Sequence, residues 1–127
     1  MKVAVYGSLR KGFHNHNAFL SKAEFLETTQ TVNKYDMYSL GSYPYVDLDN
    51  QDLDTNITVE VYEIDKDILS RLDYLEGYPS FYNRTEVKLE NGMAAWMYHI
   101  NNRVGGYRKT KPVTSGDWLQ FKQEKVA

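Results

Sequence analysis

Apolar and polar residues alternate in several short stretches of the chain, a pattern typical of β-strands. Residues 57–64 show it most clearly. The aliphatic side chains at positions 57, 59 and 61 would lie on one side of a strand, and the polar and aromatic side chains at positions 58, 60 and 62 on the other. This alternation predicts a half-buried strand. Residues 3–6 and 35–40 are shorter strand candidates, and after about residue 24 a threonine-rich segment favours strand over helix.

Residues that favour turns separate these strands. Asn91-Gly92 lies between residues 84–89 and 94–100, and this dipeptide predicts a two-residue hairpin loop. A short helix is expected from about Asn15, where apolar side chains fall at helical spacing.

A second helix has a clear beginning and end. Asp65 is suited to cap its N-terminus, and Gly77 followed by Pro79 ends it after Glu76.

The remaining segments are expected to be irregular. Residues 42–45 and 47–56 are predicted loops, and the tail, with Gly105-Gly106, is a predicted loop that ends in a short packed segment. We find no repeat and no linker, so the sequence predicts a single α+β domain over residues 1–127.

Composition and charge remove several classes of function. The 127 residues include 15 basic and 17 acidic side chains without a long run of either sign, so nucleic acid is not an expected partner. The absence of cysteine excludes thiolate nucleophiles, disulfides and iron–sulfur clusters. No apolar run approaches the roughly 20 residues of a membrane span, and the first one is too short for a signal peptide. A cytoplasmic protein with no membrane partner is expected.

Glu76 stands out in the second helix. At about 100° per residue, with Ile68 at zero, Leu72 falls near 40°, Leu75 near −20° and Glu76 near 80°. The carboxylate is thus inside the apolar arc, and in the last turn, where the helix dipole disfavours an anion. Violations of local rules concentrate at functional sites, and desolvation raises a carboxyl pKa toward the range of a general acid or base.

Other interpretations of the carboxylates remain open. The helix end can fray, so that Glu76 turns to water or pairs with a cation such as Arg84. Asp73 falls near 140°, outside the apolar arc, and is expected to be solvated. Glu60 faces either solvent or a cavity.

The loop after the first strand has two glycines at the Walker interval. Phe13-His14 stands where Lys-Ser/Thr is required, which argues against a nucleotide-binding loop. The backbone N–H groups after Gly7 could still hold an anion, or Gly7 and Gly12 merely turn the chain.

Two further chemistries receive little support. His14, His16 and His99 could supply three imidazole ligands, but no acidic residue lies at metal-motif spacing near them. Ser8 could be a nucleophile, but no histidine and acid are placed to activate it. We expect no metal and no cofactor.

Several motifs taken together resemble the gamma-glutamylcyclotransferase-like family, which includes the gamma-glutamylamine cyclotransferases and the plant AIG2-like proteins. Combined at this spacing they are specific, and further matches extend the resemblance over most of the chain. One departure is Val59, where the family often has glycine. The motifs are Tyr6-Gly7-Ser8-Leu9, Gly12 with Asn15 and His16, Leu72-Asp73-Tyr74-Leu75-Glu76-Gly77-Tyr78-Pro79, and Tyr82-Asn83-Arg84.

The resemblance implies a small mixed β-barrel with short helices packed outside and a cavity at one end. It implies that Glu76 is the catalytic acid/base and that Arg84 is structural. The substrate-binding residues that it implies are Tyr6, Gly7, Ser8, Leu9 and Tyr82.

The family's reaction needs few groups. In a gamma-glutamyl amide the substrate's own α-amine attacks its γ-carbonyl and releases 5-oxoproline, so the enzyme needs no nucleophile and no metal. The expected partner is therefore a small gamma-glutamyl compound. The alternative is a non-catalytic small-ligand-binding or regulatory member of the same fold. The sequence indicates neither the leaving amine nor the oligomeric state.

Overall fold

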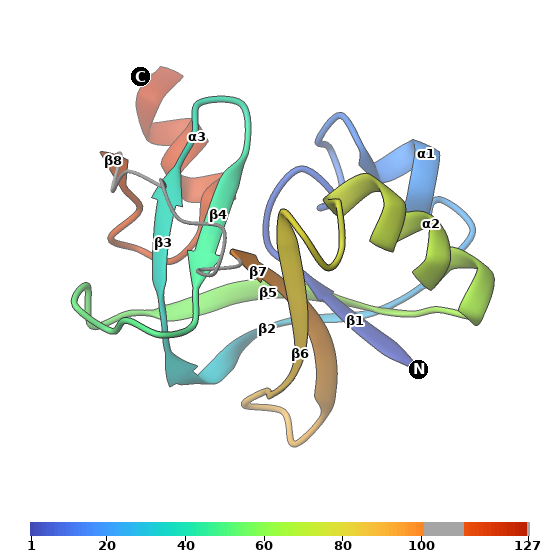
Figure 1. Ribbon diagram of the computed structural model, residues 1–127. Helices are drawn as coiled ribbons and strands as arrows, with labels where there is room; N and C mark the ends of the chain where they lie inside the picture. The colour runs from blue at the N-terminus through green and yellow to red at the C-terminus, as the bar shows by residue number, and fades with distance from the viewer. Residues whose placement is uncertain (101–110, 127) are drawn as a thin grey trace.

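The computed structural model describes residues 1–100 and 111–126, and these form short strands and three helices (Figure 1). Strand is the dominant element, as the alternating pattern predicts. The elements are β1 Lys2–Val5, α1 His16–Leu20, β2 Glu24–Lys34, β3 Asp36–Ser39, β4 Pro44–Asp47, β5 Asn56–Glu63, α2 Lys66–Glu76, β6 Tyr82–Lys88, β7 Ala94–Ile100, β8 Lys111–Pro112 and α3 Trp118–Val126.

The strands form two sheets. The larger has the order β2-β5-β1-β7-β6, and the smaller has the order β4-β3-β8. Strand β1 lies in the centre of the larger sheet, antiparallel to β5 and parallel to β7. The loop that follows β1 therefore begins at the middle of the molecule, where a cavity can form.

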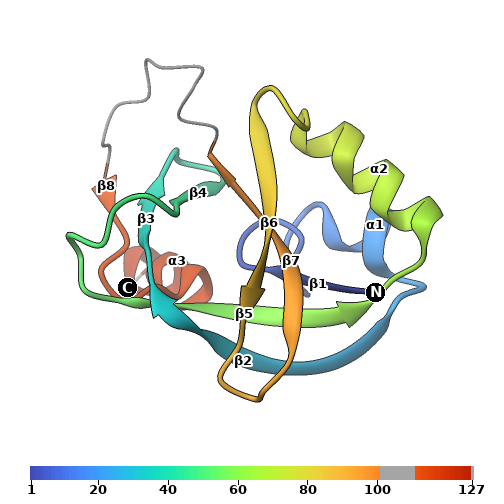
Figure 2. The same ribbon diagram turned by 60° about the horizontal axis from the view of Figure 1, so that its bottom comes forward.

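The α+β class is confirmed, but the expected closed barrel is wrong. In the described part of the chain, the edge strand β2 meets the residue after β6 at an isolated bridge between Thr31 and Leu89. Closure needs a continuous ladder between the two edges. Strand β2 has register irregularities, and the sheet curves without joining its edges (Figure 2).

Two expected loops contain regular structure. Residues 44–47 form β4, which pairs with β3 and begins with Pro44, a position where a missing N–H is tolerated. The packed segment at the end of the chain is helix α3, with Trp118 and Phe121 buried. The first helix is shorter than expected, because it ends at Leu20. The predicted turn at Gly105-Gly106 lies outside the described residues.

Both faces of the larger sheet are buried. Helices α1 and α2 lie side by side over one face, and the smaller sheet with α3 covers the other (Figures 1 and 2). Val3 and Val5 therefore belong to one apolar cluster, and Ala4 and Tyr6 to the other. None of the described helices has the length and apolar character needed to cross a membrane.

Candidate active site

The loop after β1 begins with a tight turn. The Arg10 N–H donates to the Gly7 carbonyl over 3.0 Å, which leaves Ser8 and Leu9 at the centre of the turn. In residues 1–100 and 111–126 we find no protein acceptor for the N–H groups of Ser8 and Leu9. Such a pair of backbone donors can bind an anion.

Glycine is required at position 7 because Pro44 approaches its backbone closely. A β-carbon at this position would lie 2.7 Å from Cδ of Pro44, which is shorter than any normal contact. The glycine therefore lets β4 approach the turn.

An internal ion-pair network anchors the same loop. Arg10 is 4% exposed, and its Nε donates to Glu60 over 3.0 Å while a second guanidinium nitrogen donates to Asp117 over 2.9 Å. Glu60 also accepts from the Lys11 N–H and the Tyr62 hydroxyl. Glu60, whose surroundings the sequence left open, is thus buried and hydrogen-bonded, and it holds the loop against β5.

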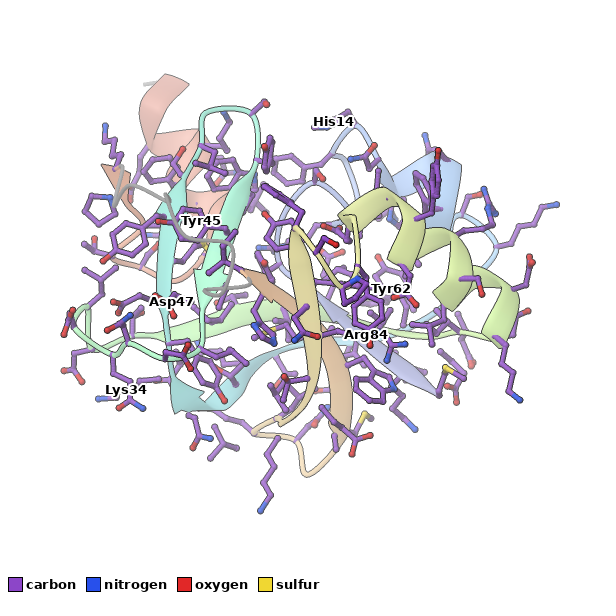
Figure 3. All side chains as sticks on the ribbon, viewed as in Figure 1. His14, Lys34, Tyr45, Asp47, Tyr62 and Arg84 are labelled. Atoms are coloured by element: carbon purple, nitrogen blue, oxygen red, sulfur yellow. The ribbon has the colours of Figure 1, made fainter. Side chains whose placement is uncertain are left out.

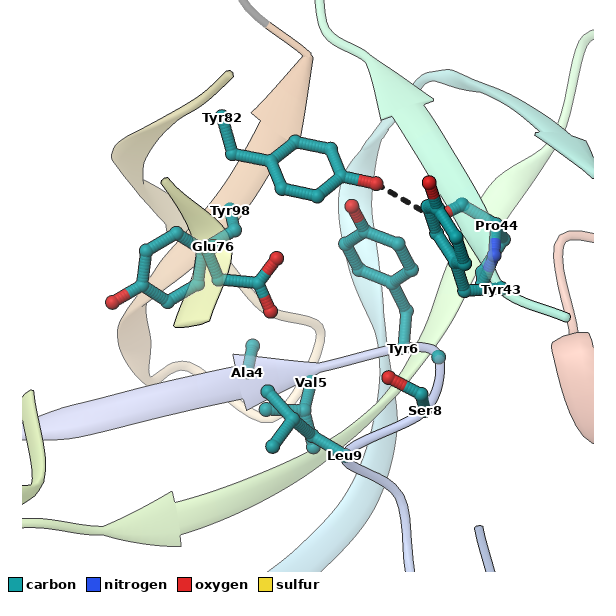
Figure 4. A pocket seen from close by; sticks show the side chains of 11 residues that line it. Ala4, Val5, Tyr6, Ser8, Leu9, Tyr43, Pro44, Glu76, Tyr82 and Tyr98 are labelled. Carbon is teal, nitrogen blue, oxygen red and sulfur yellow. Dashed lines mark hydrogen bonds between the residues drawn. The ribbon is translucent and has the colours of Figure 1, made fainter. Parts of the chain in front are cut away.

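Helix α2 carries Glu76 to the opposite wall. Asp65 caps the helix by accepting from the Ile68 N–H, and Gly77 ends it in the left-handed conformation with φ of 66°. Glu76 is the last helical residue, and its carboxylate points toward Tyr6 and Ser8 across the cavity (Figure 4).

The surroundings of Glu76 change its acidity. Burial raises the pKa of Glu76 from 4.5 to about 7, because the charged form is poorly solvated there. A carboxyl with this pKa can accept and return a proton near neutral pH.

Arg84 does not pair with Glu76, which was one of the open alternatives. Its Nε donates to Asp73 over 2.9 Å, and the Tyr98 hydroxyl donates to the same carboxylate oxygen over 2.6 Å. Asp73 was expected to be solvated, and that expectation is wrong. The helical periodicity correctly places Asp73 outside the apolar arc. It cannot show that Arg84, which comes from β6, covers that side of the helix.

All of the residues that the sequence singles out for catalysis and substrate binding line one cavity (Figure 4). Their roles remain predictions. Sequence reasoning missed the rest of the lining, since Pro44 lies in a predicted loop and nothing local marks which face of β7 Tyr98 occupies. The lining consists of Ala4, Val5, Tyr6, Gly7, Ser8, Leu9, Tyr43, Pro44, Glu76, Tyr82 and Tyr98.

Three tyrosines, Tyr6, Tyr82 and Tyr98, line the cavity around the carboxylate. Burial, with a smaller effect of the Glu76 charge, holds the pKa of Tyr6 well above its usual value. Burial also raises the pKa of Tyr98, and its hydrogen bond to Asp73 adds to this. The Tyr82 hydroxyl donates to the Pro44 carbonyl over 3.0 Å, which ties β6 to β4 above the cavity (Figure 4).

A second hollow adjoins the cavity on its outer side. Tyr43, Glu76 and Tyr82 line both. Glu76 therefore stands where the two meet. The other residues around the outer hollow are His14, Asn15, Ser42, Leu75 and Phe81.

The three histidines have separate surroundings. His14 lies at the edge of the molecule (Figure 3), the His16 ring contacts the Leu9 carbonyl, and His99 contacts Thr85. Among the described residues, no group of three or more histidines and carboxylates is arranged to hold a metal ion.

Comparison with known proteins identifies close relatives along almost the whole chain. The family model described as gamma-glutamyl cyclotransferase, AIG2-like matches residues 3–120. A protein of Methanocaldococcus jannaschii, provisionally named a gamma-glutamylcyclotransferase, is 40% identical over 124 residues, which cover 94% of this chain and 97% of that protein. The gamma-glutamylcyclotransferase family protein YtfP of Escherichia coli is 36% identical over 121 residues, which cover 94% of this chain and 96% of YtfP.

A solved structure agrees with these matches. An uncharacterized protein from Pyrococcus horikoshii superposes with a TM-score of 0.79 at 29% identity, covering 99% of this chain and 96% of that one. The motif resemblance is thereby confirmed, and the chain belongs to the gamma-glutamyl cyclotransferase, AIG2-like family.

Proposed function

We propose that this protein is a gamma-glutamyl cyclotransferase that releases 5-oxoproline and an amine. The substrate's α-amine attacks the γ-carbonyl carbon, and a C–N bond forms that closes a five-membered ring. The C–N bond to the leaving amine then breaks. Because the attack is intramolecular, holding the substrate folded supplies much of the rate, with effective molarities of about 10⁵ M or more.

Glu76 moves the protons in this scheme. Its carboxylate accepts, one after the other, the two protons that the α-ammonium group loses as it becomes the ring N–H. It donates both to the leaving nitrogen, which departs as an ammonium ion, so no net proton is gained or lost by the enzyme. A pKa of about 7 suits both transfers.

The turn after β1 supplies the backbone donors. The N–H groups of Ser8 and Leu9 bind the substrate's α-carboxylate or the oxyanion that forms during attack. The glutamyl part occupies the inner cavity, and the leaving amine lies in the outer hollow. The scissile bond is then beside Glu76, which lines both.

One observation carries the proposal: a poorly solvated carboxylate whose pKa is near neutral lies across a small cavity from two backbone N–H groups that have no acceptor among the described residues. Desolvating this carboxylate costs stability, and a role in proton transfer accounts for that cost, which favours an enzyme over the non-catalytic alternative.

The test is a panel of gamma-glutamyl amides with different leaving amines, assayed for 5-oxoproline. We expect release from at least one of them. The matched control is the same amide with its α-amine acetylated, which we expect to be inert because it lacks the nucleophile. Release of glutamate in place of 5-oxoproline would contradict the cyclisation, and binding without turnover across the panel would favour the non-catalytic alternative.

A further inference from the structure

Arg84 lies in a tightly built position close to the candidate site. Its guanidinium lies between the rings of Tyr78 and Trp96, at 4.5 and 4.6 Å from their centres. From there it makes two hydrogen bonds to Asp73, of 2.9 and 3.3 Å. Both charged side chains are largely buried, with 15% of Arg84 and 22% of Asp73 exposed. The guanidinium therefore has little freedom to turn elsewhere.

This pair is one helical turn from the proposed acid/base. Asp73 and Glu76 are three residues apart on α2, and side chains at that spacing lie on neighbouring parts of a helix surface, with β-carbons about 5 to 6 Å apart. Tyr98 connects the two places, because its hydroxyl donates to Asp73 and its ring lines the cavity beside Glu76 (Figure 4). A charge at residue 73 or 84 that lacked its partner would act on Glu76 through a poorly solvated region.

We propose that Asp73 and Arg84 form a charge-balanced positioning pair, which fixes the last turn of α2 and leaves the Glu76 carboxylate without a net neighbouring charge. The proposal rests on the function assigned above to Glu76.

The other titratable groups that face Glu76 are phenols and one imidazole. Tyr6 comes from the end of β1, Tyr82 from β6, Tyr98 from β7, Tyr43 from the loop before β4 and His14 from the loop before α1. All of them remain in every variant considered below. Differences between variants therefore report the pair alone.

Removing the charge of Asp73 and removing that of Arg84 are expected to shift the pKa of Glu76 in opposite directions. Asp73→Asn leaves the Arg84 cation unbalanced, which stabilises the Glu76 carboxylate, so its pKa falls from about 7 to about 6. Arg84→Met leaves the Asp73 anion unbalanced, so the pKa of Glu76 rises to about 8. The double variant and Arg84→Lys both return it close to the value in the unaltered protein.

The measurement is a titration of the Glu76 side-chain carboxyl by ¹³C NMR, with Glu76→Gln used to assign the signal. Asp67→Asn removes an exposed carboxylate from the first turn of the same helix and is the matched control, with no change expected. A loss of packing alone would move the Glu76 pKa in the same direction in both single variants. Shifts of equal sign, or none above about 0.3 in either folded variant, would overturn the proposal.

The pH dependence of activity is a second, independent measure of the Glu76 pKa. If the unaltered protein releases 5-oxoproline, the acid limb of its pH–rate profile is expected to move with the NMR pKa in each variant. If no gamma-glutamyl amide is turned over but the Glu76 pKa still shifts in opposite directions in the two single variants, the proposed function is wrong and the charge-balance proposal is supported. If turnover occurs but the Glu76 pKa does not shift in opposite directions, only the charge-balance proposal is wrong.

Discussion

At the scale of single residues, the site is built from backbone as much as from side chains. Glu76 is the side chain to which the proposed chemistry assigns proton transfer, while Ser8 and Leu9 contribute through their N–H groups. Gly7 contributes by having no side chain, because a β-carbon there would press on Pro44. Substitutions at neighbouring positions of this turn should therefore have very different effects.

Gly7→Val is expected to weaken substrate binding by about tenfold or more. The turn must move away from Pro44, so its backbone N–H groups no longer point at the substrate. Ser8→Ala keeps the backbone donor and loses the hydrogen bond from Asn15, so we expect a change in KM below about threefold. Steady-state kinetics on both variants, with thermal unfolding as a check on folding, makes the comparison.

The reverse order would contradict this account. An inactive Ser8→Ala beside an active Gly7→Val would indicate a serine nucleophile. A covalent acyl-enzyme detected by mass spectrometry would confirm that mechanism.

At the scale of elements, the two ends of α2 have different consequences for the site. The Asp65 cap lies at the end remote from the cavity, whereas Gly77 is adjacent to Glu76. The left-handed φ of 66° at Gly77, and Phe81 Cβ at 3.0 Å from the position that a β-carbon would take, make any side chain here strained.

Asp65→Ala is expected to lower the free energy of unfolding by about 1 kcal/mol and to leave kcat unchanged, because it removes only the N-terminal cap. Gly77→Ala is expected to cost a similar amount, about 1 kcal/mol, and to lower kcat as well, because the last turn carrying Glu76 must adjust. Urea unfolding and initial rates on the two variants test this. Equal effects on kcat would show that the C-terminal turn does not position the carboxylate.

The elements that sequence reasoning predicted well are those with local signals. The alternation at residues 57–64, the Asn91-Gly92 turn and the cap at Asp65 each depend on neighbours in the chain, and the structure has a strand, a hairpin and a helix there. The hairpin loop is longer than the predicted two residues, because the last backbone pairing before it joins Leu89 to Met93. The apolar arc of α2 likewise singled out Glu76, since helix periodicity is local.

The features that sequence reasoning missed depend on distant residues. The strand at Pro44 exists because it pairs with β3 and approaches Gly7. The burial of Glu60 requires Arg10, which is 50 residues away in the chain. Whether the sheet closes depends on how β2 and β6 meet, and nothing within either strand determines that.

At the scale of the whole molecule, the desolvation of Glu76 makes the stability of the protein depend on pH. In the unfolded chain its pKa is about 4.5, and in the folded chain it is about 7. Between these pH values the folded state binds more protons than the unfolded state, so this group makes stability fall as the pH rises. Below pH 4.5 the carboxyl is protonated in both states, and the penalty is absent.

Glu76→Gln is therefore expected to gain stability over the unaltered protein as the pH rises from 4 to 8, by up to about 3 kcal/mol. Urea unfolding at several pH values measures the difference. Glu86→Gln, an exposed glutamate on β6, is the control and should show no such trend. A difference between Glu76→Gln and the unaltered protein that is constant with pH would mean that Glu76 titrates normally.

The central claim is that Glu76 transfers the proton that lets a gamma-glutamyl amide cyclise. The most direct test is the rate of 5-oxoproline release by Glu76→Gln, on an amide that the unaltered protein turns over, with substrate binding measured separately. Glutamine has nearly the same shape but cannot accept the ammonium proton, so binding should persist while kcat falls by about 10² or more. If Glu76→Gln kept more than about a tenth of the rate, Glu76 would not be the acid/base and the account of the site would be wrong.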